Sequence, residues 1–490
     1  MKLEKILKKI YSVSRKEKVG VYVVGGYVRD LLLSVRNKKD VDFVVVGSGL
    51  GFAKKLDKKF SGLFGLSYGE KGSLVEFPDF DTARYVFTKE NKEGKKEKLL
   101  EIEFAGARTE KYDDNSRKPK VEATSLEEDL KRRDFTVNTM ARQVLSGGEL
   151  GGVIDLFDGV EDLKKKILRT PLDPDETFSE DPLRMMRAAR FASQLDFKID
   201  KKTLESIKRN VERLKIISAE RIQEELFKML ATDKPSVGLQ ILYDTGLMKM
   251  FLPEVCELAG VEEIYGQNHK DNFDHTLKVV DSVAEKTDNV VLRYTSLLHD
   301  IGKPGTKKLI PNRGWTFDMH EHLGRKIVRT ICKRLRMSNE DTEYVAHLVR
   351  WHQQPIALMD DKITDSAIRR LFVEMGDDFE DLLILCKSDI TTGNPKKKAK
   401  RLKNYDYLEQ RVEEIIEKDE MRAFQSPVRG EEIMEVCGLK PGPTVGKIKT
   451  ALEEAILDGK IPNEYEATKK LFLEIKDEYL KDVGEWERLN

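Results

Sequence analysis

Two aspartates near the N-terminus have the spacing of metal ligands. Asp40 and Asp42 lie two residues apart at the start of Asp40 to Val46, a valine-rich segment typical of a β-strand. Residues two apart on a strand project from the same face of a sheet, so the two carboxylates should lie side by side. Because like charges repel, the pair favours a cation between them, and carboxylate oxygens suit Mg²⁺. Two such ions could activate an attacking hydroxyl group and stabilise a leaving pyrophosphate.

A glycine pair precedes the aspartates. Val21 to Val24 predicts a strand, Gly25 and Gly26 predict a tight turn, and Tyr27 to Leu32 begins a helix. Glycines at such a turn let backbone N–H groups approach a phosphate in front of the helix N-terminus. The aspartate pair alone could be a solvated loop entering a strand, but beside this turn it favours a phosphate and metal site.

A third carboxylate could come from Leu100 to Phe104, where polar and apolar residues alternate as on a strand. Either Glu101 or Glu103 could lie beside the aspartate pair, and either could instead face solvent. The pattern does not choose between them.

An arginine cluster follows. Arg132 and Arg133 offer guanidinium groups that match phosphate oxygens, while Asp134 and Asn138 can bind sugar hydroxyls. The alternative is an exposed basic helix start, which is usual for such a run in isolation.

A second polar segment could read a base. Thr177 to Arg187 predicts a helix start capped by Ser179, with Asp181 and Arg184 one turn apart. A carboxylate with a guanidinium complements the amino donor and ring-nitrogen acceptor of cytosine and adenine, whereas uracil and guanine invert that edge. An ordinary surface ion pair is the alternative.

Composition bounds the answer. With 490 residues, 39% of them hydrophobic, the chain predicts several domains and is too apolar to be wholly disordered. No run of about 18 apolar residues predicts a membrane span. The four cysteines are widely spaced, which favours the reducing cytoplasm. The 87 basic and 87 acidic residues balance, but arginine clusters and the run Lys396 to Lys403 predict a positive face along head, neck and C-terminal helices.

The fold is expected to be α+β. Short β-branched runs with glycine turns predict a mixed sheet with helices up to about residue 162, and apolar residues at three- and four-residue spacing predict helices thereafter. The expected domains are a catalytic head (1–162), a helical neck (163–260), a histidine-bearing domain (261–395) and a C-terminal helical body (396–490). All seven histidines lie between His269 and His352, which suggests a local chemical role.

The motifs resemble those of one family, in order. They are the glycine turn with Arg29-Asp30, the aspartate pair, Arg132 to Asn138, Asp155 to Gly159, and Glu180 to Arg187. This order resembles class II tRNA nucleotidyltransferases, the CCA-adding enzymes, and related bacterial poly(A) polymerases. The resemblance implies a polymerase-β-like nucleotidyltransferase head over about the first 260 residues, with neck and tail helices that hold tRNA.

The resemblance also implies roles for single residues. Asp40 and Asp42 would hold Mg²⁺, and Glu103 matches the third carboxylate better than Glu101 does. The nucleotide-binding residues would be Gly25, Gly26 and Arg29 for the triphosphate, Arg133, Asp134 and Asn138 for phosphate and ribose, Asp181 and Arg184 as the base template, and Arg187 to position that template. Leu156 and Asp81 depart from the family pattern, where proline and glycine are common, and the change at Asp81 could alter a loop near the nucleotide.

The histidine segment resembles an HD phosphohydrolase domain, as some bacterial members carry. The implied ligand set is His275, His299, Asp300, His320, His352 and Asp389. Imidazole with carboxylate suits Mn²⁺, Fe, Ni²⁺ or Co²⁺, and a bound water could be the nucleophile. The substrate stays open between a 2′,3′-cyclic phosphate and a phosphomonoester. His269, His322 and His347 match no ligand position.

The expected function is CCA addition, in which CMP and AMP from CTP and ATP join a tRNA 3′ end with release of pyrophosphate. No membrane and no obligate protein partner are expected. The alternatives are a poly(A) polymerase or a CC- or A-adding enzyme, and an HD phosphohydrolase with an RNA-binding head. A dinucleotide-dependent oxidoreductase is disfavoured, because Gly47-Ser48-Gly49-Leu50-Gly51 lacks the spacing of G-x-G-x-x-G.

Overall fold

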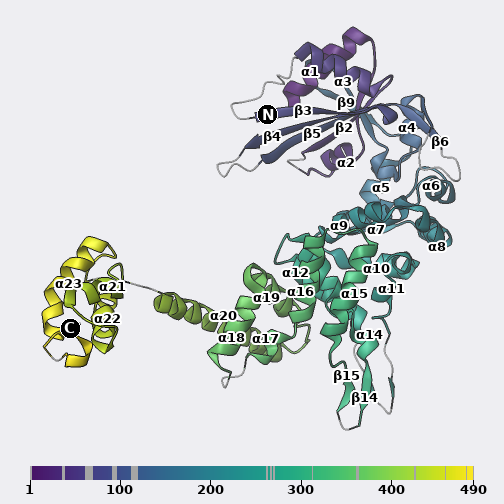
Figure 1. The fold of residues 1–490 in the computed structure, drawn as a ribbon. Helices are drawn as coiled ribbons and strands as arrows, with labels where there is room; N and C mark the ends of the chain where they lie inside the picture. Colours follow the sequence, from purple (N-terminus) through teal and green to yellow (C-terminus); the bar gives the residue numbers. More distant parts are fainter. Residues whose placement is uncertain are drawn as a thin grey trace. The chain divides into compact units, whose positions relative to one another are not determined.

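The computed structural model describes residues 3–35, 39–60, 70–90, 96–111, 120–260, 263–264, 267–268, 271–311, 313–359, 363–423, 426–457, 460–481 and 483–488 (Figure 1). The chain forms two compact units. The first comprises residues 1–353 and 380–393, and the second comprises residues 354–379 and 394–490. The four predicted domains divide the chain differently, and their boundaries stay predictions.

The head is built on a seven-stranded sheet in the order β3-β4-β5-β2-β1-β8-β9. Its strands are β1 (Val21–Val24), β2 (Asp40–Val45), β3 (Glu70–Phe77), β4 (Thr82–Glu90), β5 (Lys96–Gly106), β8 (Ala141–Val144) and β9 (Leu150–Ile154). The pair β2 and β5 is parallel and the other pairs are antiparallel, so the prediction of a mixed sheet is confirmed.

The two faces of β2 have different neighbours. Val41, Phe43 and Val45 are buried in the main hydrophobic core, and Phe43 stacks on Phe104 of β5 with ring centroids 5.1 Å apart. The helices α1 (Leu3–Glu17) and α3 (Gly49–Phe60) pack together over this face (Figure 1). Because strand residues alternate, the aspartates of β2 project from the opposite face.

The glycines of the segment 47–51 have a structural explanation. Asp81, at φ 45°, accepts hydrogen bonds at the N-terminus of α3 from the Gly49 and Leu50 N–H groups, at 3.0 and 3.3 Å, and from Ser48 Oγ, at 2.6 Å. A Cβ on Gly49 would lie 2.4 Å from the Ala105 carbonyl carbon, so this position needs glycine. A carboxylate of the chain itself therefore occupies this helix N-terminus, which removes the basis of the oxidoreductase alternative.

Helices dominate the chain beyond the head, as predicted. The neck contains α6 (Pro174–Glu180), α7 (Leu183–Leu195), α9 (Ala219–Leu230) and α10 (Pro235–Thr245), and the histidine-bearing helices are α12 (Asn272–Ala284), α13 (Val290–Leu298), α15 (His320–Arg334), α16 (Asn339–Trp351) and α19 (Phe379–Ser388). Short strand pairs, such as β10 (Ile167–Leu168) with β11 (Lys198–Ile199), lie among them. The hydrophobic core is continuous from α1 to α16.

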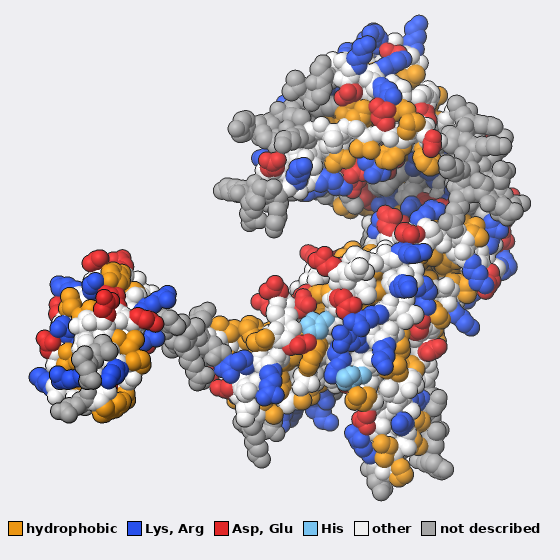
Figure 2. Space-filling model, in the orientation of Figure 1, with side chains coloured by type: hydrophobic (Ala, Val, Ile, Leu, Met, Phe, Trp, Pro, Cys, Tyr) orange, Lys and Arg blue, Asp and Glu red, His pale blue; other side chains and the backbone are white. Residues whose placement is uncertain are grey.

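The second unit contains α20 (Pro395–Ala423), followed by α21 (Gly430–Cys437), α22 (Pro443–Leu457) and α23 (Tyr465–Tyr479). These last three helices have a separate core that includes Ile433, Ile448, Leu452 and Phe472. The described helices include none that is long and apolar enough to cross a membrane. On the face shown in Figure 2, acidic and basic side chains are interspersed, so the positive face stays a prediction.

Candidate nucleotide site and candidate metal centre

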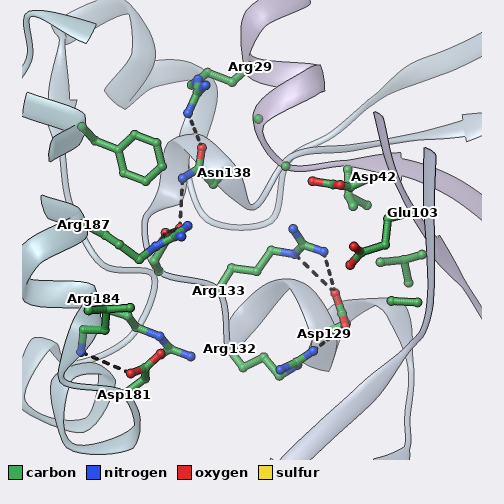
Figure 3. A pocket seen from close by; sticks show the side chains of 18 of the residues that line it. Arg29, Asp42, Glu103, Asp129, Arg132, Arg133, Asn138, Asp181, Arg184 and Arg187 are labelled. Atoms are coloured by element: carbon green, nitrogen blue, oxygen red, sulfur yellow. Dashed lines mark hydrogen bonds and ion pairs between the residues drawn. The ribbon is translucent and has the colours of Figure 1, made fainter. Parts of the chain in front are cut away.

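A pocket of about 500 Å³ lies where the head meets the neck. This volume is in the range of small-molecule sites. Figure 3 shows Asp42 and Glu103 on one side of the pocket and Asp181, Arg184 and Arg187 on the opposite side. The charged residues among those that line it are Arg29, Arg132, Arg133, Arg184, Arg187, Arg190, Arg221, Asp42, Glu103, Asp129, Asp134 and Asp181. Arginines outnumber carboxylates, which suits a polyanionic ligand.

Strand register brings the carboxylates together. In the parallel pair β2 and β5, Asp42 lies opposite Glu103 and Asp40 lies opposite Glu101. Asp42 and Glu103 line the pocket. Asp40 lies on the same face but is largely exposed, and Lys98 Nζ contacts its Oδ1 at 2.8 Å. Glu101 contacts the same Lys98 at 3.3 Å. Register therefore favours Glu103 as the carboxylate beside Asp42.

The electrostatics of Asp42 favour a cation. Water reaches the Asp42 carboxylate, but protein atoms crowd around it. This crowding and the negative charges of Glu103 and Asp40 raise its pKa to about 6. Arg133 and Arg84 act in the opposite direction and lower this pKa, but their effect is smaller. A divalent cation between these oxygens would remove that repulsion, so the residues present fit the divalent metal on which nucleotidyltransferases depend.

The glycine turn lies directly beside Asp42. Val24, the last residue of β1, pairs with Asp42, and Gly25 has φ 70°, which glycine adopts without strain. A Cβ on Gly25 would lie 3.0 Å from an Arg133 guanidinium nitrogen and 3.9 Å from Asp42 Oδ2. The helix α2 (Gly26–Leu32) begins at Gly26, one residue before the predicted start at Tyr27. Because Gly25 has no side chain, the space between the Asp42 carboxylate and the Arg133 guanidinium group stays open.

The adjacent arginines are oriented by a residue that sequence reasoning missed. The buried Asp129 of α4 (Leu126–Lys131) accepts from Arg132 NH2 at 3.1 Å and from Arg133 Nε and NH2 at 3.3 and 3.1 Å. Its spacing of three and four residues before the arginines was the available signal.

Asp134 links the head to the neck. Its Oδ1 accepts from Asn138 Nδ2 at 3.0 Å, and its Oδ2 accepts from Arg187 Nε and NH2 at 2.8 and 2.6 Å. Burial would raise the pKa of Asp134, but Arg187 and the hydrogen bonds outweigh burial and hold this pKa well below its usual value. Asn138 Oδ1 accepts in turn from Arg29 NH1 at 2.8 Å. One chain of contacts therefore joins Arg29, a predicted triphosphate ligand, to Arg187, the residue predicted to position the base template.

The motif from Asp155 to Gly159 packs against the backbone that carries Asn138. Asp155 accepts from the N–H groups of Gly159 and Val160, both at 2.8 Å, at the start of α5 (Gly159–Lys165). A Cβ on Gly159 would lie 2.3 Å from the Thr136 carbonyl oxygen, two residues before Asn138. Leu156, where the family usually has proline, is exposed at the surface.

The predicted helix start near Ser179 was wrong. Ser179 lies inside α6, which is capped by Asp173, and α7 begins after Pro182. Asp181 lies between the two helices, where its Oδ1 accepts from the Leu183 N–H at 3.2 Å. The prediction placed Pro182 in the first turn of a helix capped by Ser179, whereas Pro182 is the residue just before α7.

Further pocket residues come from neck helices with no motif signal. Phe191 of α7 lies beneath three guanidinium groups, those of Arg29, Arg187 and Arg190, at 5.3, 5.3 and 4.1 Å from its ring centroid. The buried Glu225 of α9 accepts from Arg190 Nε at 2.7 Å. Arg221, four residues before Glu225, also lines the pocket. Only the four-residue spacing of Arg221 and Glu225 could have hinted at a shared face.

The six predicted histidine-segment ligands lie together in the first unit. They come from the first turn of α12 (His275), the end of α13 (His299 and Asp300), the start of α15 (His320), the end of α16 (His352) and the residue after α19 (Asp389). Gly302 makes this possible, because a Cβ there would lie 2.1 Å from the His320 carbonyl oxygen. Figure 2 shows histidine side chains at the surface beside basic side chains, and the centre itself is mostly buried. His269 lies outside the described residues.

The four imidazoles share one hydrogen-bonding arrangement. Each Nδ1 lies 2.8 Å from an oxygen, which is Thr391 Oγ1 for His275 and a backbone carbonyl for the other three. A carbonyl fixes the proton on Nδ1 and leaves the Nε2 lone pair for a metal. The Nε2 atoms of His320 and His352 lie 3.3 Å apart, an arrangement that two lone pairs disfavour without a cation.

The six residues form two triads about Asp300. One comprises His275, His299 and Asp389, and the other comprises Asp300, His320 and His352. Asp300 Oδ2 lies 3.2 Å from His299 Nε2, and Asp300 Oδ1 lies 3.3 Å from His320 Nε2. Burial would lower the pKa of His299, but Asp300 and Asp389 outweigh burial and raise it to about 10. A divalent cation would offset the same negative charge.

Three family descriptions match the chain. "Poly A polymerase head domain" matches residues 21–169, "Probable RNA and SrmB-binding site of polymerase A" matches residues 196–258, and "tRNA nucleotidyltransferase domain 2 putative" matches residues 313–471. The three matches follow one another in the order of head, neck and the helices beyond.

Curated relatives carry nucleotidyltransferase names. The chain is 31% identical to an A-adding tRNA nucleotidyltransferase of Deinococcus radiodurans over 70% of this chain and 78% of that protein. It is 32% identical to a CC-adding tRNA nucleotidyltransferase of Thermus thermophilus over 70% and 76%. It is also 32% identical to a multifunctional CCA protein of Aliivibrio salmonicida over 75% and 84%.

Solved structures share the fold. A Bacillus stearothermophilus CCA-adding enzyme in complex with CTP is 23% identical and has a TM-score of 0.55 over 99% of this chain and 100% of that chain. A Thermotoga maritima CCA-adding enzyme with tRNA is 21% identical and has a TM-score of 0.52 over 96% and 95%. Together with the carboxylate pocket and the curated relatives, these matches show that the chain belongs to the tRNA nucleotidyltransferase family and is a nucleotidyltransferase with a poly(A) polymerase-type head.

Proposed function

We propose that this enzyme adds the complete CCA sequence to tRNA 3′ ends, with CTP and ATP as substrates and Mg²⁺ as the head metal. The observation that carries the proposal is the pocket itself. It combines the Asp42 and Glu103 carboxylates with Asp181 and Arg184, the residues proposed to read the base, inside one cavity of nucleotide size. The free cysteines support a cytoplasmic location, which we also propose.

Different residues of the pocket would bind different parts of the nucleotide. Asp40, Asp42 and Glu103 would hold Mg²⁺ near the α-phosphate, where the metal neutralises the negative charge of the reacting groups. Gly25, Gly26, Arg29 and Arg133 would bind the triphosphate. The tRNA 3′ oxygen forms a bond to the α-phosphorus, the bond to the bridging oxygen breaks, pyrophosphate leaves, and the hydroxyl proton passes to solvent.

The base would be read by protein side chains. The Asp181 carboxylate accepts from the exocyclic amino group of cytosine or adenine, and Arg184 donates to the adjacent ring nitrogen. Asp134 accepts from both Asn138 and Arg187, which supports a role in positioning Arg187. A contact of Asp134 or Asn138 with the ribose stays a prediction.

Two labelled tRNAs would test the proposal, one that lacks the whole CCA end and one that lacks only the terminal adenosine. With Mg²⁺, CTP and ATP, we expect three nucleotides on the first tRNA and one on the second. Growth by two cytidines alone would indicate CC addition. Activity confined to the second tRNA would indicate A addition, and long adenosine tails would indicate a poly(A) polymerase. Any of these three results would contradict the proposal.

We propose a second activity, metal-dependent phosphoester hydrolysis, at the histidine centre. The observation that favours it is that the Nε2 atoms of four histidines lie 3.2 to 3.8 Å from the Asp300 carboxylate oxygens. The two triads would hold metal ions such as Mn²⁺, Fe, Ni²⁺ or Co²⁺, with Asp300 as one of the carboxylate ligands, and the metal would activate a water molecule as nucleophile. Hydrolysis would form a bond from the water oxygen to phosphorus and break one P–O ester bond, so that the ester oxygen leaves as a hydroxyl group.

Metal content and hydrolysis together would test this second activity. We expect close to two ions per chain after loading with Mn²⁺ or Ni²⁺, and cleavage of a 2′,3′-cyclic nucleotide or a phosphomonoester. His299→Ala should lose metal and hydrolysis, whereas His322→Ala, at an exposed histidine outside both triads, should retain them. Wild-type protein that binds no metal at this centre would contradict the proposal.

A further inference from the structure

The proposed base-reading carboxylate is held by an arginine from a distant part of the chain. Asp181 Oδ2 accepts from Arg221 NH2 at 2.9 Å, while Asp181 Oδ1 accepts from the Leu183 N–H at 3.2 Å. Arg221 lies in the first turn of α9, forty residues further along the chain, and lines the pocket. Each oxygen of the carboxylate therefore has one fixed donor, and each keeps a lone pair for a base.

The proposed base-reading arginine is held by other groups. Arg184 NH1 donates to Glu180 Oε2 at 3.1 Å and to the Thr177 carbonyl at 3.3 Å. Among the contacts of the described residues, Asp181 and Arg184 do not pair with each other. This separation is notable because the Arg184 N–H donates to the Asp181 carbonyl at 3.0 Å, so the two residues are close in the backbone.

Two opposite charges three residues apart would ordinarily attract each other. If Asp181 and Arg184 paired, each would satisfy the other, and neither would present its edge to a base. Arg221 is a positively charged partner for Asp181, and Glu180 is a negatively charged partner for Arg184, so both compete with the Asp181–Arg184 pair. The competing pairs thereby keep an acceptor and a donor available in the same pocket.

We propose that Arg221 is a positioning residue for base selection, which holds the Asp181 carboxylate apart from Arg184 and ready to accept from the amino group of cytosine or adenine. This inference rests on the proposed function. Arg221 acts through Asp181 and does not itself need to touch the base.

The exposure of Arg221 separates this role from a purely structural one. Its side chain is 50% exposed, and an ion pair that open to water contributes little to stability. By contrast, the neighbouring Glu225 is buried and accepts from Arg190 at 2.7 Å, so Glu225 joins α9 to α7 through a buried ion pair. Removal of the Arg221 charge should therefore change base selection much more than stability.

The test compares Arg221→Gln with Arg221→Lys and with the control Arg213→Gln. Arg213 is also a neck arginine, and its NH2 donates to the Ser179 carbonyl of α6 at 2.8 Å, but it does not line the described pocket. The measurement is kcat/KM for CTP against UTP and for ATP against GTP on the two tRNA substrates. For Arg221→Gln we expect both ratios to fall about tenfold, chiefly through a higher KM for CTP and ATP. Arg221→Lys should restore most of the selectivity, and Arg213→Gln should leave both ratios unchanged.

A double-substitution cycle completes the test. Because Arg221 acts through Asp181, adding Arg221→Gln to Asp181→Asn should cause little further loss of selectivity. Unchanged ratios in Arg221→Gln, or additive losses in the double variant, would overturn the inference while leaving CCA addition intact. Absence of CMP and AMP incorporation by the unsubstituted protein would instead overturn the proposed function, and this inference with it.

Discussion

Asp42 and Glu103 show how strand register selects a residue for chemistry. Both Glu101 and Glu103 project from the same face of β5, but the parallel pairing places Glu103 opposite Asp42 and Glu101 opposite Asp40. Glu103 also accepts from Arg84 NH2 at 2.8 Å, and Glu101 contacts Arg84 Nε at 3.2 Å. The two glutamates thus share one neighbour and differ in their distance along the sheet from the pocket.

This difference predicts unequal effects of two matched substitutions. Glu103→Gln should lower kcat for CMP incorporation by about a hundredfold or more, because it removes charge beside Asp42, whereas Glu101→Gln should lower it only a few-fold. Steady-state kinetics at saturating Mg²⁺ would measure both. A larger loss in Glu101→Gln would mean that the metal site is centred on Asp40 and Glu101.

The Asp42 carboxylate should lower the stability of the fold although activity requires it. Its folded-state pKa of about 6 lies above the ordinary aspartate value, so its charged form destabilises the fold once pH rises through that pKa. Without divalent metal, Asp42→Asn should be more stable than wild type at pH 8 by about 1 kcal/mol, a figure reduced because the side chain is exposed. The difference should shrink toward zero as pH falls below 4, and the variant should be inactive. Urea unfolding in EDTA at several pH values would reveal it. A stability difference that does not vary with pH would contradict this prediction.

At the scale of elements, the N-terminus of helix α3 is capped by Asp81, a residue from a distant loop. Asp81 adopts a left-handed conformation at φ 45°, which glycine adopts without strain and aspartate tolerates. In return its carboxylate accepts three hydrogen bonds at the N-terminus of α3. Asp81 is absent from the described pocket lining, and its carboxylate contacts the start of α3.

Asp81→Gly should therefore change stability and leave substrate choice alone. Loss of the cap should lower the free energy of unfolding by about 1 kcal/mol, after the relief of backbone strain is counted. Asp81→Asn, which keeps an acceptor oxygen, should fall between wild type and Asp81→Gly. Denaturant unfolding would measure stability, and the ratio of CMP to AMP incorporation should stay at the wild-type value. A shift in that ratio would show that the loop reaches the nucleotide.

At the scale of the molecule, the neck and the histidine-bearing helices are joined through Arg293 of α13. This buried side chain donates from NH1 to the carbonyls of Leu230 and Thr232, at 2.8 and 3.0 Å, at the end of α9. It also donates from Nε to the Thr287 carbonyl at 2.9 Å. Because α9 carries Arg221 and α13 leads into His299, one residue supports the frame of both proposed sites.

Arg293→Met should be strongly destabilising, by about 3 kcal/mol or more, because several buried carbonyls would lose their donor. Arg329→Met removes an exposed ion pair with Glu343 and should be nearly neutral. Thermal unfolding followed by tryptophan fluorescence would compare the two. Equal effects would show that the junction does not depend on the buried guanidinium.

The order of the motifs in the sequence was enough to predict the family and much of the catalytic head. Local spacing was enough to predict the glycine turn, the aspartate pair, the arginines after α4 and the two sets of helices, because strand alternation and helix periodicity operate over a few residues. The resemblance carried by these ordered motifs named the family, and the curated relatives and structures bear it out.

Tertiary structure decided what local spacing could not. Glu103 was separated from Glu101 by pairing between strands that lie about 60 residues apart in the chain. Arg221 reached Asp181 from another helix, and five elements brought the six histidine-centre residues together. Side chains far apart in sequence meet only when the core positions their backbones, so no local pattern reports these distances. The sequence by itself determined which chemical groups are present, and the fold determined which of them share a site.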